Sequence, residues 1–139
     1  MKNLLGRHIL SGVEMGVVPK SEDDYWDRDA ESISFVLDGK TYMAIEDPSD
    51  GYRSYSGDIV EVSDKVKLKN TFAPHEVDIT HKDRYEEEDD GWNRRCDIYI
   101  FTDILTGKVI MEIGTDNTND YYPSCVMYFN PENLYINHQ

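Results

Sequence analysis

Apolar and polar residues alternate in several short segments of this chain, a pattern typical of half-buried β-strands. The clearest segment is residues 33–37, which read Ile-Ser-Phe-Val-Leu. The dipeptide Asp38-Gly39 follows, and a second β-rich segment, residues 40–45, comes directly after it. Because Asp-Gly tolerates positive φ at both turn positions, this stretch predicts a tight β-hairpin.

A second hairpin is predicted from residues 96–102 and 108–113, which are rich in β-branched and aromatic residues. The connecting residues 103–107 end in a glycine, as a turn requires. Asp97 and Glu112 fall between apolar neighbours, so we expect one wet face on this hairpin.

The other strand signals are weaker. Residues 7–15 predict a strand with a bulge or bend at Gly12. Asn130-Pro131 closes a short strand at residues 125–129. Further candidate strands are residues 58–62, 66–72, 75–81 and 134–136, and short helices are candidates within residues 131–134 and 19–28. The pattern therefore predicts a mainly β protein of seven to nine antiparallel strands, folded as a sandwich, a curved sheet or a small open barrel.

A chain of 139 residues has the length of a single domain, here residues 1–139, and 39% hydrophobic residues are enough for a core. Its charge is unusual: 28 Asp and Glu face 14 Lys and Arg, a formal net charge of −14. Such a chain repels nucleic acid and anionic membranes and attracts basic partners, although high acidity can also serve solubility alone. No signal peptide or membrane-length apolar segment is evident, so we expect a cytoplasmic protein.

Acidic residues gather in two segments expected to be loops, residues 19–31 and 83–95. The second contains five successive acids, which repel one another and predict a solvated loop. As a binding device it would be an anionic arm with an aromatic anchor near each end. The candidate partner-binding residues are Tyr85, Glu86, Glu87, Glu88, Asp89, Asp90 and Trp92. The alternative is a plain loop that connects two strands.

A different site is conceivable in two other polar segments. Tyr52, Arg53 and Tyr55 could stack on a flat ring and pair with a phosphate. Residues 114–123 are dense in oxygen donors, but they lack the glycine and glutamate positions of a Ca²⁺-binding EF-hand loop, so no metal site is predicted. The candidate ligand-binding residues are Tyr52, Arg53, Tyr55, Asn117, Asn119, Tyr121 and Tyr122. Both segments could equally be ordered turns held by Asn and Asp side chains.

No pattern of a catalytic site is evident. The four histidines show no zinc-ligand spacing with Cys96 and Cys125, and neither a phosphate-binding glycine loop nor a nucleophile elbow occurs. His75 and His81 lie an even number of residues apart and would share one face of a strand, where half-exposed surface positions are expected. We therefore expect a protein that is not an enzyme and has no cofactor.

Four segments carry a broader likeness: residues 5–14 (LGRHILSGVE), 35–42 (FVLDGKTY), 46–54 (EDPSDGYRS) and 112–123 (EIGTDNTNDYYP). Together they resemble a family of small uncharacterised bacteriophage and prophage proteins. The resemblance implies no settled activity. It does imply two classes of function that phages use, namely acidic inhibitors of host defence that imitate DNA, such as anti-CRISPR and anti-restriction proteins, and sponges for the nucleotides of host immune signalling.

The leading hypothesis is an acidic, phage-type protein that inhibits a host defence protein by occupying a basic, nucleic-acid-binding surface. The alternative is an oligomeric sponge that sequesters a small signalling nucleotide. A third possibility is a virion or housekeeping accessory protein. In each case we expect no direct binding to nucleic acid or membrane, and a location in the cytoplasm of the infected host.

Overall fold

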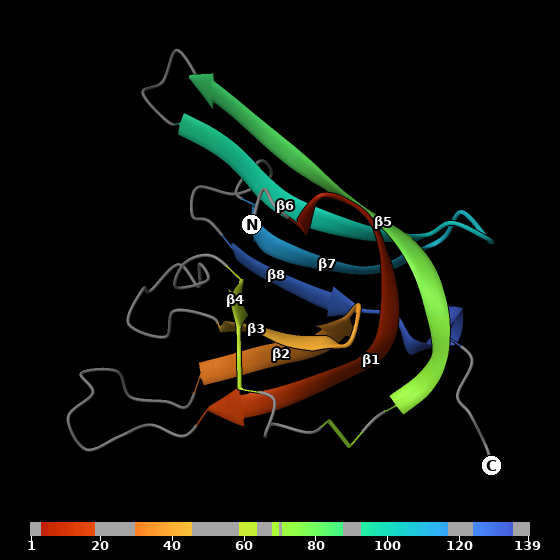
Figure 1. The fold of residues 1–139 in the computed structure, drawn as a ribbon. Helices are drawn as coiled ribbons and strands as arrows, with labels where there is room; N and C mark the ends of the chain where they lie inside the picture. Colours follow the sequence, from red (N-terminus) through yellow and green to blue (C-terminus); the bar gives the residue numbers. More distant parts are fainter. Residues whose placement is uncertain are drawn as a thin grey trace.

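Eight strands form one open antiparallel sheet in the computed structural model, in the order β4-β3-β2-β1-β5-β6-β7-β8 (Figure 1). This confirms the predicted mainly β fold and its number of strands. The described residues are 4–18, 30–45, 59–63, 68–69, 71–87, 93–116 and 124–134. The elements are β1 (Gly6–Val18), β2 (Ala30–Leu37), β3 (Lys40–Ile45), β4 (Val60–Glu61), β5 (Thr71–Glu87), β6 (Asn93–Asp103), β7 (Val109–Asp116), β8 (Ser124–Phe129) and the 3-10 helix η2 (Pro131–Asn133).

Both predicted hairpins are present. Strands β2 and β3 are joined by Asp38 and Gly39, whose φ angles of 52° and 83° are both positive. Strands β6 and β7 are joined by the turn of residues 103–107, where Gly107 also has a positive φ of 72°. Asp38, Gly39 and Gly107 therefore occupy turn positions that require a positive φ, as the sequence predicts.

Strand β1 turns a corner in its middle. Its first part, up to Leu10, pairs mainly with β5, and its second part, from Gly12 on, pairs mainly with β2. Both ladders shift register between Leu10 and Gly12, which confirms the predicted bulge. Pro74, which has no amide hydrogen, lies at the matching irregular part of β5. A bulge of this kind lets one strand serve two packed layers.

The corner brings the two halves of the sheet face to face around one core. Phe35 of β2 and Phe101 of β6 are three strands apart in the sheet order, which in a flat sheet would mean about 14 Å. Their ring centroids lie 5.2 Å apart, edge to face. The fully buried side chains around this contact are Leu10, Val13, Ile33, Leu37, Val77, Ile79, Ile110, Met111 and Ile113.

Of the short elements predicted from weaker signals, some are present in the described residues and others are not. The helical turn predicted near residue 131 is η2, with Pro131 in its first turn and the Asn130 side chain accepting a hydrogen bond from the Glu132 amide. Among the described residues of the candidate strand 58–62, Val60 and Glu61 form β4. Of the candidate strand 66–72, Leu68 and Lys69 are not in a strand, whereas Thr71 and Phe72 begin β5. Leu134 ends η2 and packs against the core, and residues 135–136 of the predicted last strand lie outside the described residues. The candidate helix in residues 19–28 lies outside the described residues.

Gly114 is a position where the sheet tolerates no side chain. Its φ is +154°, and a Cβ built there would lie 2.1 Å from the Asp97 carbonyl oxygen and 2.7 Å from Ile98 Cα. We expect Gly114→Ala to reduce the free energy of unfolding by roughly 3 kcal/mol or more, because backbone atoms of β6 would have to move. Urea denaturation measures the loss.

The matched control for this change is Gly16→Ala. Its Cβ would meet the Ser32 hydroxyl at 3.3 Å, and that side chain can rotate away. We expect a change below about 1 kcal/mol there. Equal effects at the two positions would contradict the steric account of Gly114.

Candidate functional site

The acidic arm predicted from the sequence belongs to a projecting part of β5 and β6. The pairing of β5 with β1 ends at Ile79, and the pairing of β6 with β7 begins at Cys96. Residues 85–87 and 93–95, here called the ribbon, therefore have no sheet partner among the described residues except each other. In Figure 1 the ends of β5 and β6 extend together away from the rest of the sheet.

The expectation of a solvated loop across residues 83–95 needs correction. Strand β5 continues to Glu87 and β6 begins at Asn93, so Tyr85, Glu86 and Glu87 are strand residues. Likewise Ala30 and Glu31, assigned to the acidic loop 19–31, are the first residues of β2. The loop was expected because the acids repel one another along the chain. That argument did not include the residues of β6 that lie opposite them.

The register supplies the physical reason. Glu86 is directly opposite Arg94, and Tyr85 is directly opposite Arg95. Opposite charges at facing positions of an antiparallel pair favour the pairing. The two arginines that follow the acidic run thus make a strand compatible with the start of that run.

Several predicted site residues lie outside the described residues. In the acidic arm these are Glu88, Asp89, Asp90 and Trp92. In the alternative ligand site they are Tyr52, Arg53, Tyr55, Asn117, Asn119, Tyr121 and Tyr122. Tyr85, Glu86 and Glu87 are the predicted site residues for which the structure describes a backbone position, on β5.

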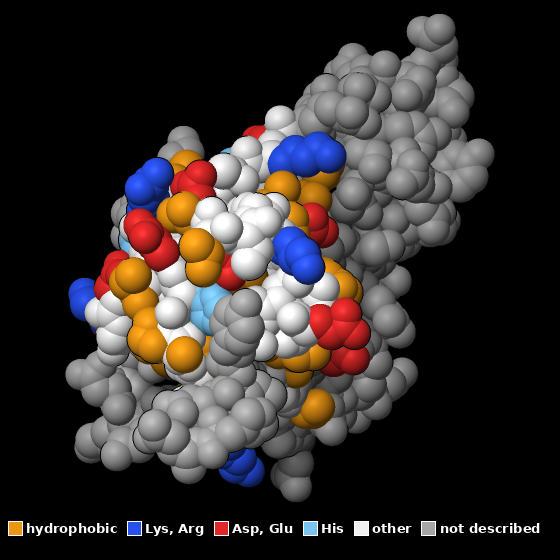
Figure 2. Space-filling view, turned by 90° about the vertical axis from the view of Figure 1, so that its right-hand side faces the viewer, with side chains coloured by type: hydrophobic (Ala, Val, Ile, Leu, Met, Phe, Trp, Pro, Cys, Tyr) orange, Lys and Arg blue, Asp and Glu red, His pale blue; other side chains and the backbone are white. Residues whose placement is uncertain are grey.

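The negative charge is unevenly divided along the chain. The described residues hold 14 of the 28 acidic and 8 of the 14 basic residues, a net of six negative charges. On the face shown in Figure 2, acidic and basic side chains lie interspersed with apolar ones. Exposed ion pairs such as Arg7 with Glu76 at 3.7 Å and Lys40 with Glu61 at 3.9 Å add to this mixing. No single-sign surface is evident on that face of the described residues.

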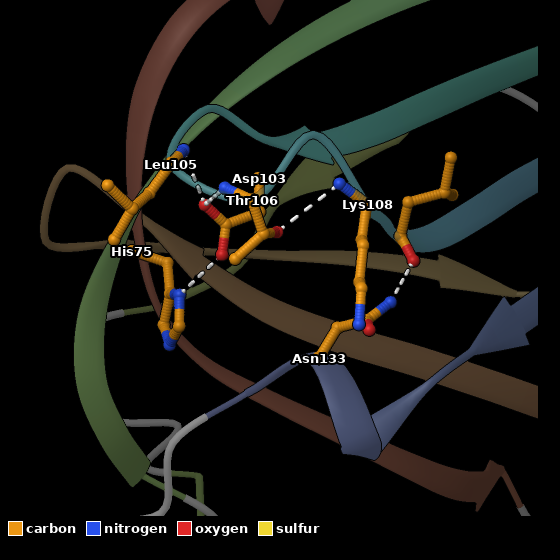
Figure 3. Close-up of polar contacts among 7 residues, drawn as sticks. His75, Asp103, Leu105, Thr106, Lys108 and Asn133 are labelled. Atoms are coloured by element: carbon orange, nitrogen blue, oxygen red, sulfur yellow. Dashed lines mark hydrogen bonds and ion pairs between the residues drawn. The ribbon is translucent and has the colours of Figure 1, made fainter.

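Histidine and aspartate form a buried pair that sequence reasoning missed. His75 Nδ1 lies 3.0 Å from Asp103 Oδ2, and both side chains are nearly inaccessible to solvent. The other oxygen of Asp103 accepts hydrogen bonds from the Leu105 and Thr106 amides (Figure 3). One carboxylate therefore holds both the imidazole on β5 and the turn between β6 and β7. His75 is buried, where the sequence led us to expect a half-exposed position.

The second pair lies farther along the same face of β5. His81 shares this face with His75, as predicted, and its Nε2 lies 2.6 Å from Asp97 Oδ1. Its ring stacks on Tyr99 at a centroid distance of 4.4 Å. Asp97 follows the inward-facing alternation of Tyr99 and Phe101 on β6, so it is not part of the wet face assigned to it.

A third pair joins β1 to the first hairpin turn. His8 Nδ1 lies 2.6 Å from Asp38 Oδ2, while Asp38 Oδ1 accepts from the Ile9 amide at 2.9 Å. These two hydrogen bonds, that from His8 first, hold the pKa of the Asp38 carboxyl below its usual 3.8. The arrangement locks the Asp38-Gly39 turn onto β1.

The three pairs have no residue in common. Within the described residues, no group of three or more His, Cys, Asp or Glu side chains is placed to hold a metal ion. Asp38 and Asp103 each accept a hydrogen bond from a backbone amide as well as contacting a histidine, and Asp97 contacts His81. We therefore assign the pairs a structural role. The alternation of residues 75, 77, 79 and 81 indicated the shared face, but not that aspartates on β6 would be opposite it.

Comparisons with known proteins were made at the level of family models, curated sequences and solved structures, and none found a match. The described residues contain no helix long and apolar enough to cross a membrane. The candidate site is therefore defined by its own geometry and charge.

The buried pair at Asp103 makes a stability prediction. We expect Asp103→Ala to lower the free energy of unfolding by roughly 3 kcal/mol, because it removes two bonds to the turn and leaves His75 buried without this carboxylate. Asp103→Asn keeps an acceptor for the turn amides and should cost less. Urea denaturation with Glu132→Ala, an exposed acid on η2, as control measures both. A loss at Asp103→Ala as small as the control's would contradict the assignment.

The Asp38 pair predicts a pH dependence. A carboxyl whose pKa is lower in the folded than in the unfolded chain adds stability above the unfolded pKa, and that stability is lost as the pH falls through the folded pKa. We expect Asp38→Asn to remove this contribution at neutral pH while keeping a favourable Asn-Gly turn. The two proteins should therefore converge in stability below pH 3.8. Unfolding measured from pH 7 to 2 tests this, and a constant difference would refute it.

Proposed function

We propose that this protein is a non-catalytic acidic binding protein whose β5–β6 ribbon inserts an anionic end into a basic, nucleic-acid-binding surface of another protein. The observation that carries the proposal is the ribbon itself. It projects beyond the body of the sheet and leads directly into the acids of residues 86–90, in a chain of net charge −14. The phage resemblance makes a host defence protein the target class.

The ribbon supports this role better than a flexible loop would. A paired strand is ordered before binding, so less conformational entropy is lost when it docks. Its charge attracts a basic surface at a distance, and the association should weaken as salt shortens the Debye length to about 8 Å at physiological ionic strength.

The mixed charge of the body supports the same division of labour. Acidic and basic side chains alternate on the face of Figure 2, so that face offers a basic partner no sustained attraction. Residues 86–90 carry five acids in succession. A binding role for the acids is therefore assigned to the ribbon end and not to the whole surface.

The test begins with native mass spectrometry of the protein isolated from cells that express phage defence systems. We expect a retained basic protein that binds nucleic acid. Its association rate is then measured with the variant Glu86→Gln, Glu87→Gln, Glu88→Gln, Asp89→Asn and Asp90→Asn. At low salt this rate should fall by about tenfold or more, because electrostatic steering is lost.

The matched control neutralises five acids on the body and keeps the ribbon: Glu31, Glu61, Glu76, Asp78 and Glu132. The two variants have the same net charge, so a larger effect of the ribbon variant isolates position from total charge. Equal association rates for the ribbon variant and the unchanged protein would overturn the proposal. A retained mass of a few hundred daltons without any protein would overturn it in favour of a nucleotide sponge.

A further inference from the structure

The outer edge of β5 loses its neighbour halfway along. Strand β1 begins at Gly6, which is opposite Ile79 of β5, so β5 has no β1 neighbour beyond Ile79. The φ of Gly6, +102°, turns the chain inward, where Leu4 is buried in the core. Strand β5 nevertheless continues for residues 80–87, here called the β5 edge. No described residue pairs with the β5 edge on the side away from β6.

The direction of the backbone groups along this edge follows from one hydrogen bond. The Ile104 amide donates to the Glu76 carbonyl at 3.0 Å. In an antiparallel ladder such bonds recur at every second residue, so even-numbered β5 residues direct their amide and carbonyl groups toward β6. Odd-numbered residues direct theirs to the opposite side, where Val77 and Ile79 face β1.

The same alternation continues past the end of β1. The amide and carbonyl groups of residues 81, 83, 85 and 87 therefore point to the side that β1 has left. Lys82 and Asp83 are exposed there. A row of unpaired backbone groups on a regular strand is a template for the addition of another strand.

We propose that the β5 edge pairs with the β5 edge of a second copy of this chain, so that the two sheets join into one. A two-fold axis perpendicular to an antiparallel sheet pairs residues of the same face. With the axis at Arg84, Lys82 is opposite Glu86 of the second copy, and His81 is opposite Glu87 of the second copy. Each pairing occurs twice, and Asp83 is opposite Tyr85.

Charge selects this register over its neighbours. With the axis at Asp83, Lys82 would face Arg84 of the second copy twice. With the axis at Tyr85, Asp83 would face Glu87 twice, which offsets the two attractive pairs of Arg84 with Glu86. Like charges directly opposite each other are unfavourable, whereas opposite charges stabilise a pair. In the chosen register the two attractive pairs of Lys82 with Glu86 outweigh the single like-charge pair, in which Arg84 faces Arg84 of the second copy. The inference is independent of the proposed target, and such a dimer would carry an acidic run at each end of the shared ribbon.

The backbone part of the proposal is tested with Asp83→Pro in sedimentation velocity at physiological salt. The unchanged protein should show a concentration-dependent dimer. Proline removes the Asp83 amide hydrogen, which points away from β6, so the ladder within one chain is kept. We expect the variant to be monomeric with an unchanged circular dichroism spectrum. A dimer that survives this change, or an unchanged protein that is monomeric at about 0.5 mM, would overturn the proposal.

The register is tested by exchanging charges. Lys82→Glu and Glu86→Lys should each weaken dimerisation by about tenfold, because two attractive pairs become repulsive. Combining both changes in one chain should restore it. Mixing the two single variants should form a heterodimer, since each then offers the charge that the other lacks. Lys108→Glu, an exposed control at the β6–β7 turn, should leave the dimer unchanged.

Each outcome of the exchange has a defined meaning. Recovery in the double variant and in the mixture supports the register with the axis at Arg84. Single variants that dimerise as well as the Lys108→Glu control would refute that register. Loss of dimerisation in the double variant would also refute it when hydrogen exchange of the β5 amides shows that β5 and β6 are still paired at residue 86, which is opposite Arg94.

Discussion

The bulge between Leu10 and Gly12 in β1 is the constraint on which the rest of this structure depends. A single eight-stranded sheet has two broad faces, and one layer alone cannot bury its apolar side chains. Because β1 changes partners at the bulge, its two parts belong to two layers that close on one core. The contact of Phe35 with Phe101 exists only because of this corner. The matching irregularity near Pro74 in β5 places a residue without an amide hydrogen where the ladder is interrupted.

The histidine–aspartate pairs follow from the same architecture. Where the layers meet, strand ends and turns bring backbone polar groups to the rim of an apolar core, and buried polar groups need partners. Asp103 satisfies two turn amides and contacts His75, and Asp38 does the same for one amide and His8. With His81 bonded to Asp97, three histidines of the chain are engaged with carboxylates, and no metal-binding group of side chains occurs in the described residues.

The sequence predicts the local parts of this fold better than its long-range parts. The hairpin at Asp38-Gly39 and the bend at Gly12 are encoded by a few neighbouring residues, and both are present. The partner of His75 is 28 residues away along the chain, and only the register of β5 with β6 reveals it. The prediction of a loop at the start of the acidic run is wrong for the same reason. The repulsion between the acids is visible in the sequence, whereas only the register shows that Arg94 and Arg95 are their cross-strand neighbours. The predicted ligand residues in segments 52–55 and 117–122 lie outside the described residues, so they stay predictions.

The ribbon shows how a strand can extend past its sheet without losing order. Beyond Ile79, β5 no longer pairs with β1, and from residue 85 on its partner β6 no longer pairs with β7. The order of the ribbon therefore depends on the pairing of β5 with β6 and on the charged residues opposite each other in it. Those charges alternate along β5, with Lys82 and Arg84 on one face and Asp83 on the other. Alternation of this kind discourages indiscriminate edge-to-edge association, because most registers bring like charges together. The few registers in which opposite charges meet are therefore selected, and an edge that repels most strands can still recognise one.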